Sequence, residues 1–439
     1  MYIETKLENN IKVLLIPVRD SKIITIKLIF KIGSDNETKN TLELAHFVEH
    51  MFAQYTSSKY PNYSKLISNI KKLGIYRNAS VDYSITDYYM KGQSIHFDFM
   101  LDVLYNTYVN FKLDTEHLEQ ERNSVIEEIN TMLNDSWTNL TTDINKNLYP
   151  GHIRELSQRE NIKNVKRLDG KDIINFYNKY YNNKNLVIAI GGDFTPAKTI
   201  KKLNQTFGKC NRNGLVTKFT HITNSNVNSI NKPIISFVKN DNTTSSKLNI
   251  IFKIPYTYFD NEKYLIYSIS SILSNGMSSR LYNRLRENAG LVYYIKSSVQ
   301  LSNTSKTLNN FCLDTEVADN KLTDVIDIII DELQKIKEAE ITNDELIKHQ
   351  NETKTYKLVE KQNKSPNRLL NNYSTYMLWN KKIITDKDEH QMFMDITKKD
   401  IKDIANKMFD MSNVMIMYSG KTNKNKDIKK ILKKYNINI

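Results

Sequence analysis

Two stretches of the chain are similar in sequence, at a constant offset of 228 residues. Leu168–Gly192 (LDGKDIINFYNKYYNNKNLVIAIGG) matches Ile396–Gly420 (ITKKDIKDIANKMFDMSNVMIMYSG). Each copy predicts an amphipathic helix led by an aspartate, then a turn, then a buried apolar strand. The starts of the two halves also resemble each other, Ile24–Ile32 with Leu248–Ile254. A repeat this long indicates two duplicated domains and not a solenoid of short units.

The order of the predicted elements indicates an α+β fold. Each half runs strand, helix, strand, long helices, helix, strand, which is typical of helices packed on a mostly antiparallel sheet. Around residues 210–232, Asn, Ser, Thr and Lys crowd together with little apolar periodicity, so the join falls there. We therefore expect one domain at 1–215, a linker at 216–232 and a homologous second domain at 233–439.

Composition argues against several other classes of protein. No run of about 18 apolar residues is present, so we expect no membrane span. The N-terminus has no apolar signal core, so the expected location is cytoplasmic. Cys210 and Cys312 are far apart and indicate neither a disulfide framework nor a cysteine zinc site. The net charge is +14, but the lysines are scattered apart from a cluster at Lys421–Lys434, and no nucleic-acid motif accompanies them, so we expect no nucleic-acid partner.

The segment His46–His50 (HFVEH) has the order of the inverted zinc-peptidase motif, H-x-x-E-H. If residues 42–53 are helical, both imidazoles and the Glu49 carboxylate lie along one face at about 100° per residue. The opposite side then faces the core through Leu44, Phe47, Val48 and Met51. Imidazoles four residues apart reach one Zn²⁺, and the carboxylate can take a proton from its water. The alternative is a partly buried helix with two structurally satisfied histidines.

A metal peptidase needs a third protein ligand, and the segment 114–133 offers candidates. Asp114 can cap a helix there, and Leu113 with Leu118 can form a hydrophobic staple across its start. One apolar stripe is predicted to point inward: Leu118, Val125, Ile129 and Met132. Glu121 and Glu128 lie on the edge of that stripe, whereas Glu127 points away. Geometry therefore favours Glu128 or Glu121 as the ligand.

Together, His46-x-x-Glu49-His50 and the later Glu121-Arg122-Asn123-x-Val125-x-x-Glu128 resemble the insulinase/pitrilysin family of zinc peptidases, which includes the mitochondrial processing peptidases. The resemblance implies one Zn²⁺ per chain, bound by His46, His50 and Glu128. It implies that Glu49 is the general base and that Glu121 supports the site by orienting a ligand.

Two more segments carry the same resemblance. Arg77-Asn78-Ala79, followed by Thr86-Asp87-Tyr88-Tyr89, resembles the family strand on which Asn78 and Ala79 would bind substrate by strand addition. In the second half, Arg286-Glu287 followed by Gly290-Leu291-Val292-Tyr293 resembles the family's R-E-x-x-G-L-x-Y segment. This implies that Arg286 and Tyr293 contact the substrate and the developing oxyanion. Alone, the segment also fits a basic helix end, a glycine cap and a strand.

The chain departs from the family pattern at two places. Glu43 stands where the family usually has glycine, three residues before His46. Its carboxylate can bond a ligand histidine, or it can lean outward at the helix start, where a negative charge suits the helix dipole; we favour the second. The Gly-Gly pair that usually precedes the Asn-Ala pair appears only as Gly74.

The resemblance implies a zinc-dependent endopeptidase that cleaves unfolded peptides in a closed chamber. Each two-domain chain would form half of a clam-shell, in a homodimer or in a heterodimer with a homologous subunit. Arg286 and Tyr293 would then reach the zinc of the other copy. One alternative is a dedicated peptidase that matures a single precursor, such as a leader-bearing or bacteriocin-like peptide, alone or with a non-identical partner. Another is an inactive scaffold subunit.

Overall fold

The computed structural model describes residues 2–135, 137–156, 158–219, 232–362 and 365–438. Most of the predicted linker, 220–231, lies outside these residues. The chain divides into two compact units: the first contains 1–132, 157–220 and 359–386, and the second contains 133–156, 221–358 and 387–439. The units differ from the continuous division at 1–215 and 233–439, because each includes a helical segment from the other half of the chain. The α+β class is confirmed.

The first unit is built on a six-stranded sheet in the order β1-β2-β6-β3-β5-β4. Its strands are antiparallel except for the parallel pair β2 and β6. Every residue of the central strand β6 is buried, as its apolar sequence predicts. The strands are β1 (Ile3–Lys6), β2 (Lys12–Pro17), β3 (Ile23–Phe30), β4 (Tyr76–Val81), β5 (Thr86–Gln93) and β6 (Leu186–Gly192).

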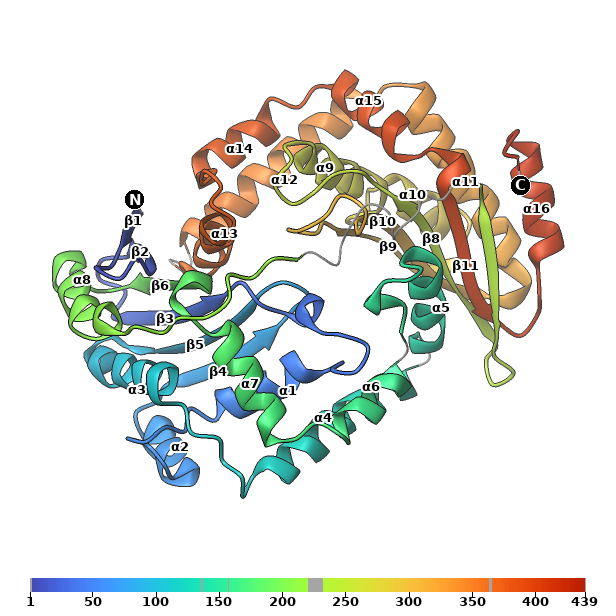
Figure 1. Cartoon of the computed structure of the whole chain (residues 1–439). Helices are drawn as coiled ribbons and strands as arrows, with labels where there is room; N and C mark the ends of the chain where they lie inside the picture. Colours follow the sequence, from blue (N-terminus) through green and yellow to red (C-terminus); the bar gives the residue numbers. More distant parts are fainter. Residues whose placement is uncertain (1, 136, 157, 220–231, 363–364, 439) are drawn as a thin grey trace. The chain divides into compact units, whose positions relative to one another are not determined.

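Helices cover both faces of this sheet. Helices α1, α3 and α7 lie on one face, and α13, from the second half of the chain, lies on the other (Figure 1). At Gly191 a Cβ atom would come within 2.6 Å of Pro366 Cγ, so a glycine permits this close packing. The helices of the unit are α1 (Leu44–Ala53), α2 (Tyr63–Lys72), α3 (Phe97–Asn110), α4 (Leu118–Asn134), α6 (Gln158–Val165), α7 (Gly170–Tyr180), α8 (Pro196–Gln205) and α13 (Asn367–Leu378).

The second unit is built on a five-stranded sheet in the order β7-β11-β8-β10-β9. Only β7 and β11 run parallel among its described pairs. The strands are β7 (Ile234–Lys239), β8 (Ser245–Lys253), β9 (Val292–Gln300), β10 (Asn310–Ala318) and β11 (Val414–Gly420). The helices are α5 (Thr138–Leu148), α9 (Glu262–Ser274), α10 (Arg280–Tyr282), the π-helix η6 (Asn283–Asn288), α11 (Leu322–Glu338), α12 (Asn343–Gln362), α14 (Asp386–Met394), α15 (Lys398–Met408) and α16 (Asn425–Lys434).

Successive residues of strand β8 in the second sheet point to opposite faces and pack into two different cores. Ile250 and Phe252 join a large core with α9, α11 and α15. Ile251 faces the other way, where α5 from the first half of the chain covers the sheet. The small core on that face contains Leu140, Ile144, Leu148, Tyr149, Ile251, Leu308, Met415 and Met417. The two halves of the chain have therefore exchanged covering helices: α5 belongs to the second unit and α13 to the first.

The internal repeat folds as predicted in both units. Its first copy forms α7 and β6, and its second copy forms α15 and β11. Both helices begin with a capping box, Asp169 with Asp172 and Thr397 with Asp400, so the aspartates of the repeat lie in the first turn. Each repeat strand pairs in parallel with a neighbour on one side and antiparallel with another on the other side.

One inward-facing residue was predicted wrongly. Val125 and Ile129 of α4 are buried, but Met132 is 48% exposed. Met132 lies where the first segment of unit 1 ends. Within the described residues, no helix combines the length and the apolar character that a membrane crossing requires.

Candidate metal centre

Helix α1 sets the two histidines of the motif beside a cavity. The helix begins at Leu44, two residues later than predicted, and its apolar side is buried through Leu44, Phe47, Val48 and Met51. The buried carboxylate of Glu37 accepts hydrogen bonds from the backbone N–H groups of Glu43 and Ala45, which satisfies the start of the helix. Burial, reinforced by the charge of Glu43, raises the pKa of Glu37 well above its usual range.

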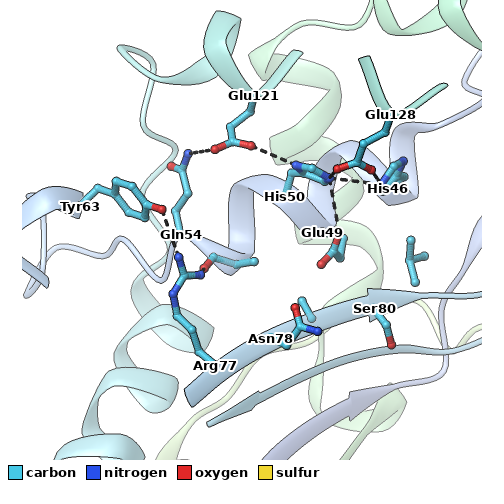
Figure 2. A pocket seen from close by; sticks show the side chains of 13 residues that line it. His46, Glu49, His50, Gln54, Tyr63, Arg77, Asn78, Ser80, Glu121 and Glu128 are labelled. Atoms are coloured by element: carbon cyan, nitrogen blue, oxygen red, sulfur yellow. Dashed lines mark hydrogen bonds and ion pairs between the residues drawn. The ribbon is translucent and has the colours of Figure 1, made fainter. Parts of the chain in front are cut away.

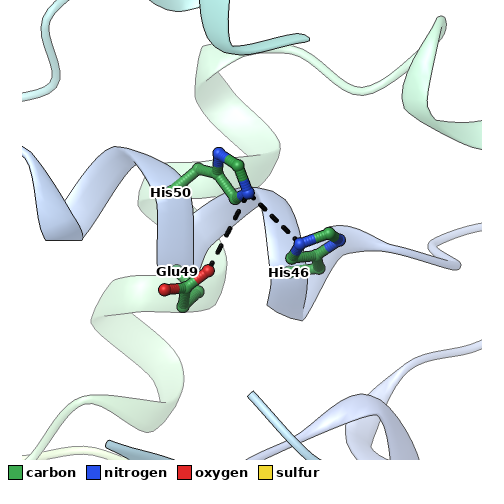
Figure 3. A group of neighbouring side chains, drawn as sticks. All are labelled: His46, Glu49 and His50. Carbon is green, nitrogen blue, oxygen red and sulfur yellow. Dashed lines mark hydrogen bonds and ion pairs between the residues drawn. The ribbon is translucent and has the colours of Figure 1, made fainter. Parts of the chain in front are cut away.

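The donor atoms of three side chains converge on one point. The Nε2 atoms of His46 and His50 lie 3.2 Å apart (Figure 3). From α4, Glu128 brings Oε2 to 3.4 Å from His46 Nε2 and Oε1 to 3.7 Å from His50 Nε2. Donors bonded to one tetrahedral zinc ion at about 2.0–2.1 Å lie about 3.3 Å from one another. The spacing of the two imidazoles and Glu128 therefore fits three corners of such a site.

The protonation of the imidazoles also favours a cation. Each Nδ1 atom lies against a carboxylate, His46 Nδ1 at 2.8 Å from Glu43 and His50 Nδ1 at 3.0 Å from Glu121. A carboxylate accepts, so each neutral imidazole carries its proton on Nδ1 and has a lone pair on Nε2. Two lone pairs 3.2 Å apart repel unless a positive charge lies between them.

Glu49 lies slightly farther from the imidazoles than Glu128 does. Its Oε2 is 4.0 Å from His50 Nε2, and the ligand atoms of His46, Glu49 and His50 all lie within 4.8 Å of one another. This trio is a possible zinc site by itself, but Glu128 approaches both Nε2 atoms more closely. Burial raises the pKa of Glu49, and the neighbouring histidines only partly oppose this. A raised pKa suits a carboxylate that must take and return a proton near neutral pH.

The expectation for Glu43 was wrong. Its carboxylate does not lean outward but bonds His46. The reason is local: Glu43 has a φ of 69°, in the left-handed region, and Glu37 already occupies the helix start. The hydrogen bond and charge of Glu43, aided by Glu49 and Glu128, outweigh the lowering effect of burial and raise the pKa of His46.

Glu121 and Gln54 support His50 from the other side. Glu121 Oε2 accepts from His50, and Oε1 accepts from the Gln54 amide at 3.2 Å (Figure 2). The hydrogen bond from His50 keeps the pKa of Glu121 below its usual value, although burial acts in the opposite direction. Gln54 was not predicted from the sequence, although it lies four residues after His50 and therefore on the same helix face.

The cluster opens into a cavity of about 460 Å³ whose opposite wall is strand β4. Figure 2 shows Asn78 and Ser80 of this strand across the cavity from Glu49 and His50. Among the described strands, β4 is the last of its sheet and pairs only with β5, so within this part of the chain its outer edge is open to pairing with an extended peptide. Asn78 and Ala79 both line the cavity. Arg77 is held at its end by the Ala53 carbonyl at 2.6 Å and the Tyr63 hydroxyl at 3.1 Å.

Arg286 and Tyr293 belong to the second unit, where they contact each other. Arg286, in η6, donates to the Tyr293 backbone carbonyl at 2.7 Å, and its guanidinium lies 4.6 Å from the Tyr293 ring centroid. The turn between them contains Gly290 at a φ of 60°, which favours glycine. The Tyr293 side chain is largely exposed. Their predicted contact with substrate stays a prediction.

Comparison with known proteins gives consistent matches across both halves. Residues 12–154 match the model of the insulinase family (peptidase family M16), and residues 167–353 match the model of the peptidase M16 inactive domain. The metal cluster falls within the first of these matches, and Arg286 and Tyr293 fall within the second.

Two named zinc proteases are similar along most of the chain, and one subunit of a processing peptidase is similar along less than half of it. Zinc protease PqqE of Helicobacter pylori is 23% identical over 92% of this chain and 89% of its own length, and the uncharacterized zinc protease YmxG of Bacillus subtilis is 24% identical over 77% and 79%. The beta subunit of the mitochondrial-processing peptidase of Caenorhabditis elegans is 23% identical over 46% of this chain and 43% of its own length.

Solved structures share the fold. A protease from Helicobacter pylori superposes with a TM-score of 0.83 at 21% identity, covering 95% of this chain and 99% of that one. A chain of complex III2 from Candida albicans superposes with a TM-score of 0.76 at 14% identity, covering 98% and 99%. With matching family models over both halves and the same two-domain fold, the chain belongs to the insulinase family of peptidases, M16, in its short two-domain form.

Proposed function

We propose that this protein is a zinc-dependent endopeptidase that cleaves unfolded peptides. The observation that carries the proposal is the pair of Nε2 atoms 3.2 Å apart, each with its Nδ1 against a carboxylate and with Glu128 as a third donor. Similarity to named zinc proteases supports it.

We assign His46, His50 and Glu128 to hold one zinc ion. When bound, the ion supplies Lewis acidity, which activates a water and polarises the scissile carbonyl. Glu49 accepts the proton of the attacking water and delivers it to the leaving amine. Burial raises the pKa of its carboxyl group, which suits this role. Glu121 keeps the His50 imidazole in the tautomer whose Nε2 is free to bind.

The substrate would bind as an extended strand along β4. Backbone pairing to a sheet edge depends little on side chains, so it accepts many peptide sequences but requires an unfolded segment. Asn78 and Ala79 lie on this strand, beside the metal cluster. Arg286 and Tyr293 of one copy would hold the peptide at the metal cluster of the other copy, with the Tyr293 hydroxyl donating to the developing oxyanion.

We further propose that the chain works as a dimer in which both copies carry a complete metal cluster. The relative from Caenorhabditis elegans is named as one subunit of a peptidase, which favours a paired assembly. A homodimer needs no additional gene product, because this chain has both the metal cluster and the Arg286–Tyr293 pair. The closed chamber and the cytoplasmic location stay predictions.

One preparation of the full chain tests the function. Metal analysis should find one zinc per chain, light scattering should find a dimer, and a pool of unfolded peptides should be cleaved. Glu49→Gln should retain zinc and lose about 10²- to 10⁴-fold in turnover, because the carboxylate that moves the proton is gone. If Glu49→Gln cleaves peptides at the rate of the wild type, Glu49 is not the general base.

The same peptide pool separates the alternatives. A dedicated maturation enzyme would ignore most of the pool, and a scaffold subunit would cleave none of it. A wild-type protein that contains no zinc and binds none when it is supplied would contradict the proposal.

A further inference from the structure

The two metal-binding imidazoles are held by two matching side-chain arms. On one side, His50 Nδ1 lies 3.0 Å from Glu121, whose other oxygen accepts from the Gln54 amide. On the other side, His46 Nδ1 lies 2.8 Å from Glu43 Oε2, and Glu43 Oε1 accepts from the Asn161 amide at 2.7 Å. Each arm has the order imidazole, carboxylate, amide. From the sequence, Glu121 was expected to support a ligand, whereas Glu43, at a position where the family usually has glycine, was expected to lean outward.

The conformation of Glu43 is costly for a glutamate. Its φ of 69° is in the left-handed region, which glycine adopts easily and L-residues with a Cβ atom adopt at an energetic cost. Glu43 also stands close to the buried carboxylate of Glu37, whose pKa its charge helps to raise. A glycine would avoid both the left-handed strain and the repulsion from Glu37. The Glu43 side chain therefore needs an interaction whose contribution offsets these two costs.

Helix capping does not supply that contribution. Glu43 makes no side-chain hydrogen bond to the start of α1, because Glu37 accepts from the backbone N–H groups there. The two oxygens of Glu43 are instead directed to His46 and Asn161, and the side chain is 18% exposed. Asn161 lies on α6, so this arm also links a second helix to the metal centre.

We propose that Glu43, held by Asn161, is a positioning residue for His46 that fixes the tautomer and ring orientation of this zinc ligand. The inference rests on the zinc site proposed above. An imidazole whose Nδ1–H is bound to a carboxylate presents Nε2 to the metal and is a more basic ligand. With Glu121 performing the same task for His50, both histidines are oriented before the metal binds.

Two substitutions of Glu43 test the inference in the full chain. Glu43→Gly removes the arm and relieves the left-handed conformation, so the protein should fold at least as well as the wild type. Glu43→Gln retains an oxygen that can accept from His46 and loses only the charge. Glu127→Gln is the matched control, because it removes a carboxylate from an exposed position on α4.

Zinc affinity is measured by competition with a chelating indicator. Glu43→Gly should weaken zinc binding by about 10- to 100-fold, Glu43→Gln by less, and Glu127→Gln should have no effect. The zinc-free Glu43→Gly protein should unfold at a temperature no lower than that of the wild type. A purely structural role would lower that unfolding temperature together with the affinity, and this outcome would overturn the proposal.

A second readout does not depend on zinc. At a pH high enough to keep His46 neutral, long-range ¹H–¹⁵N spectra of the histidines in the zinc-free protein should show His46 as the Nδ1–H tautomer in the wild type and in Glu43→Gln, and as a mixture in Glu43→Gly. An unchanged tautomer, or a zinc affinity within about twofold of the wild type, would refute the role of Glu43. If the wild type itself binds no zinc, the proposed function fails, while the tautomer spectra still decide whether Glu43 orients His46.

Discussion

The choice between Glu128 and Glu49 as the third zinc ligand can be decided by neutralising each carboxylate. Glu128 lies 3.4 and 3.7 Å from the two Nε2 atoms, whereas Glu49 Oε2 lies 4.0 Å from His50 Nε2. We therefore expect Glu128→Gln to reduce zinc affinity strongly. Glu49→Gln should change zinc affinity much less, although it should lower turnover by about 10²- to 10⁴-fold.

The size of the effect follows from the distances. Two unit charges about 4 Å apart interact by about 4 kcal/mol at an effective dielectric constant of about 20. The double charge of zinc increases this value, but the Glu128 side chain is 51% exposed and solvent screens it. A remaining contribution of about 2–4 kcal/mol corresponds to a zinc Kd raised by about 30- to 1,000-fold.

The control is the neighbouring residue on the same helix. Glu127→Gln removes the same charge one position away, on the exposed side of α4, and should leave the zinc Kd unchanged. Competition titrations with a chelating indicator measure all three variants, and circular dichroism checks that they are folded. If Glu49→Gln releases zinc while Glu128→Gln retains it, the roles assigned to the two carboxylates are exchanged and the distance argument fails.

Two further predictions concern stability. His349 is buried, bonds Ser268 Oγ at 2.8 Å, and has its pKa lowered by burial, with a smaller opposing effect of Glu352. As the pH falls below about 6.5, His349 is protonated in the unfolded chain but stays neutral in the folded chain. The free energy of unfolding is therefore unaffected by His349 above about pH 6.5 and decreases as the pH drops below it. The loss of Tm between about pH 7.5 and about pH 5.5 should be smaller in His349→Gln, and an equal loss would show that His349 does not contribute. Leu140 of α5 is fully buried against the second sheet, so Leu140→Ala should cost about 2–5 kcal/mol in chemical denaturation, whereas the exposed Asn139→Ala should cost little; equal effects would contradict the packing of α5.

Local patterns in the sequence predicted the elements that build the site. Helix α1 follows from the spacing of its apolar residues, and the facing of Glu121 and Glu128 follows from the inward stripe of α4 that Val125 and Ile129 define. Both predictions succeed because the apolar residues of each helix lie on one side. Their spacing therefore predicts which face of the helix is buried.

Other features depend on long-range packing or on an unusual backbone conformation. The apolar faces of α5 and α13 predict that these helices are buried, but not that each covers the sheet of the other half. A glutamate does not signal a left-handed φ, and this φ, together with Glu37 at the helix start, directs the Glu43 carboxylate toward His46. Asn161 carries no sequence signal at all, since only the placement of α6 brings it to Glu43.

The exchange of α5 and α13 has a consequence for how this protein is made. While the ribosome is still translating the second half, the first sheet has no α13 to cover it, and that face stays open until about residue 378 has emerged. Fragments severed between the two halves would each lack the helix that covers one face of their sheet. They should become stable only by reassociating, so a gene split there would yield two mutually dependent polypeptides.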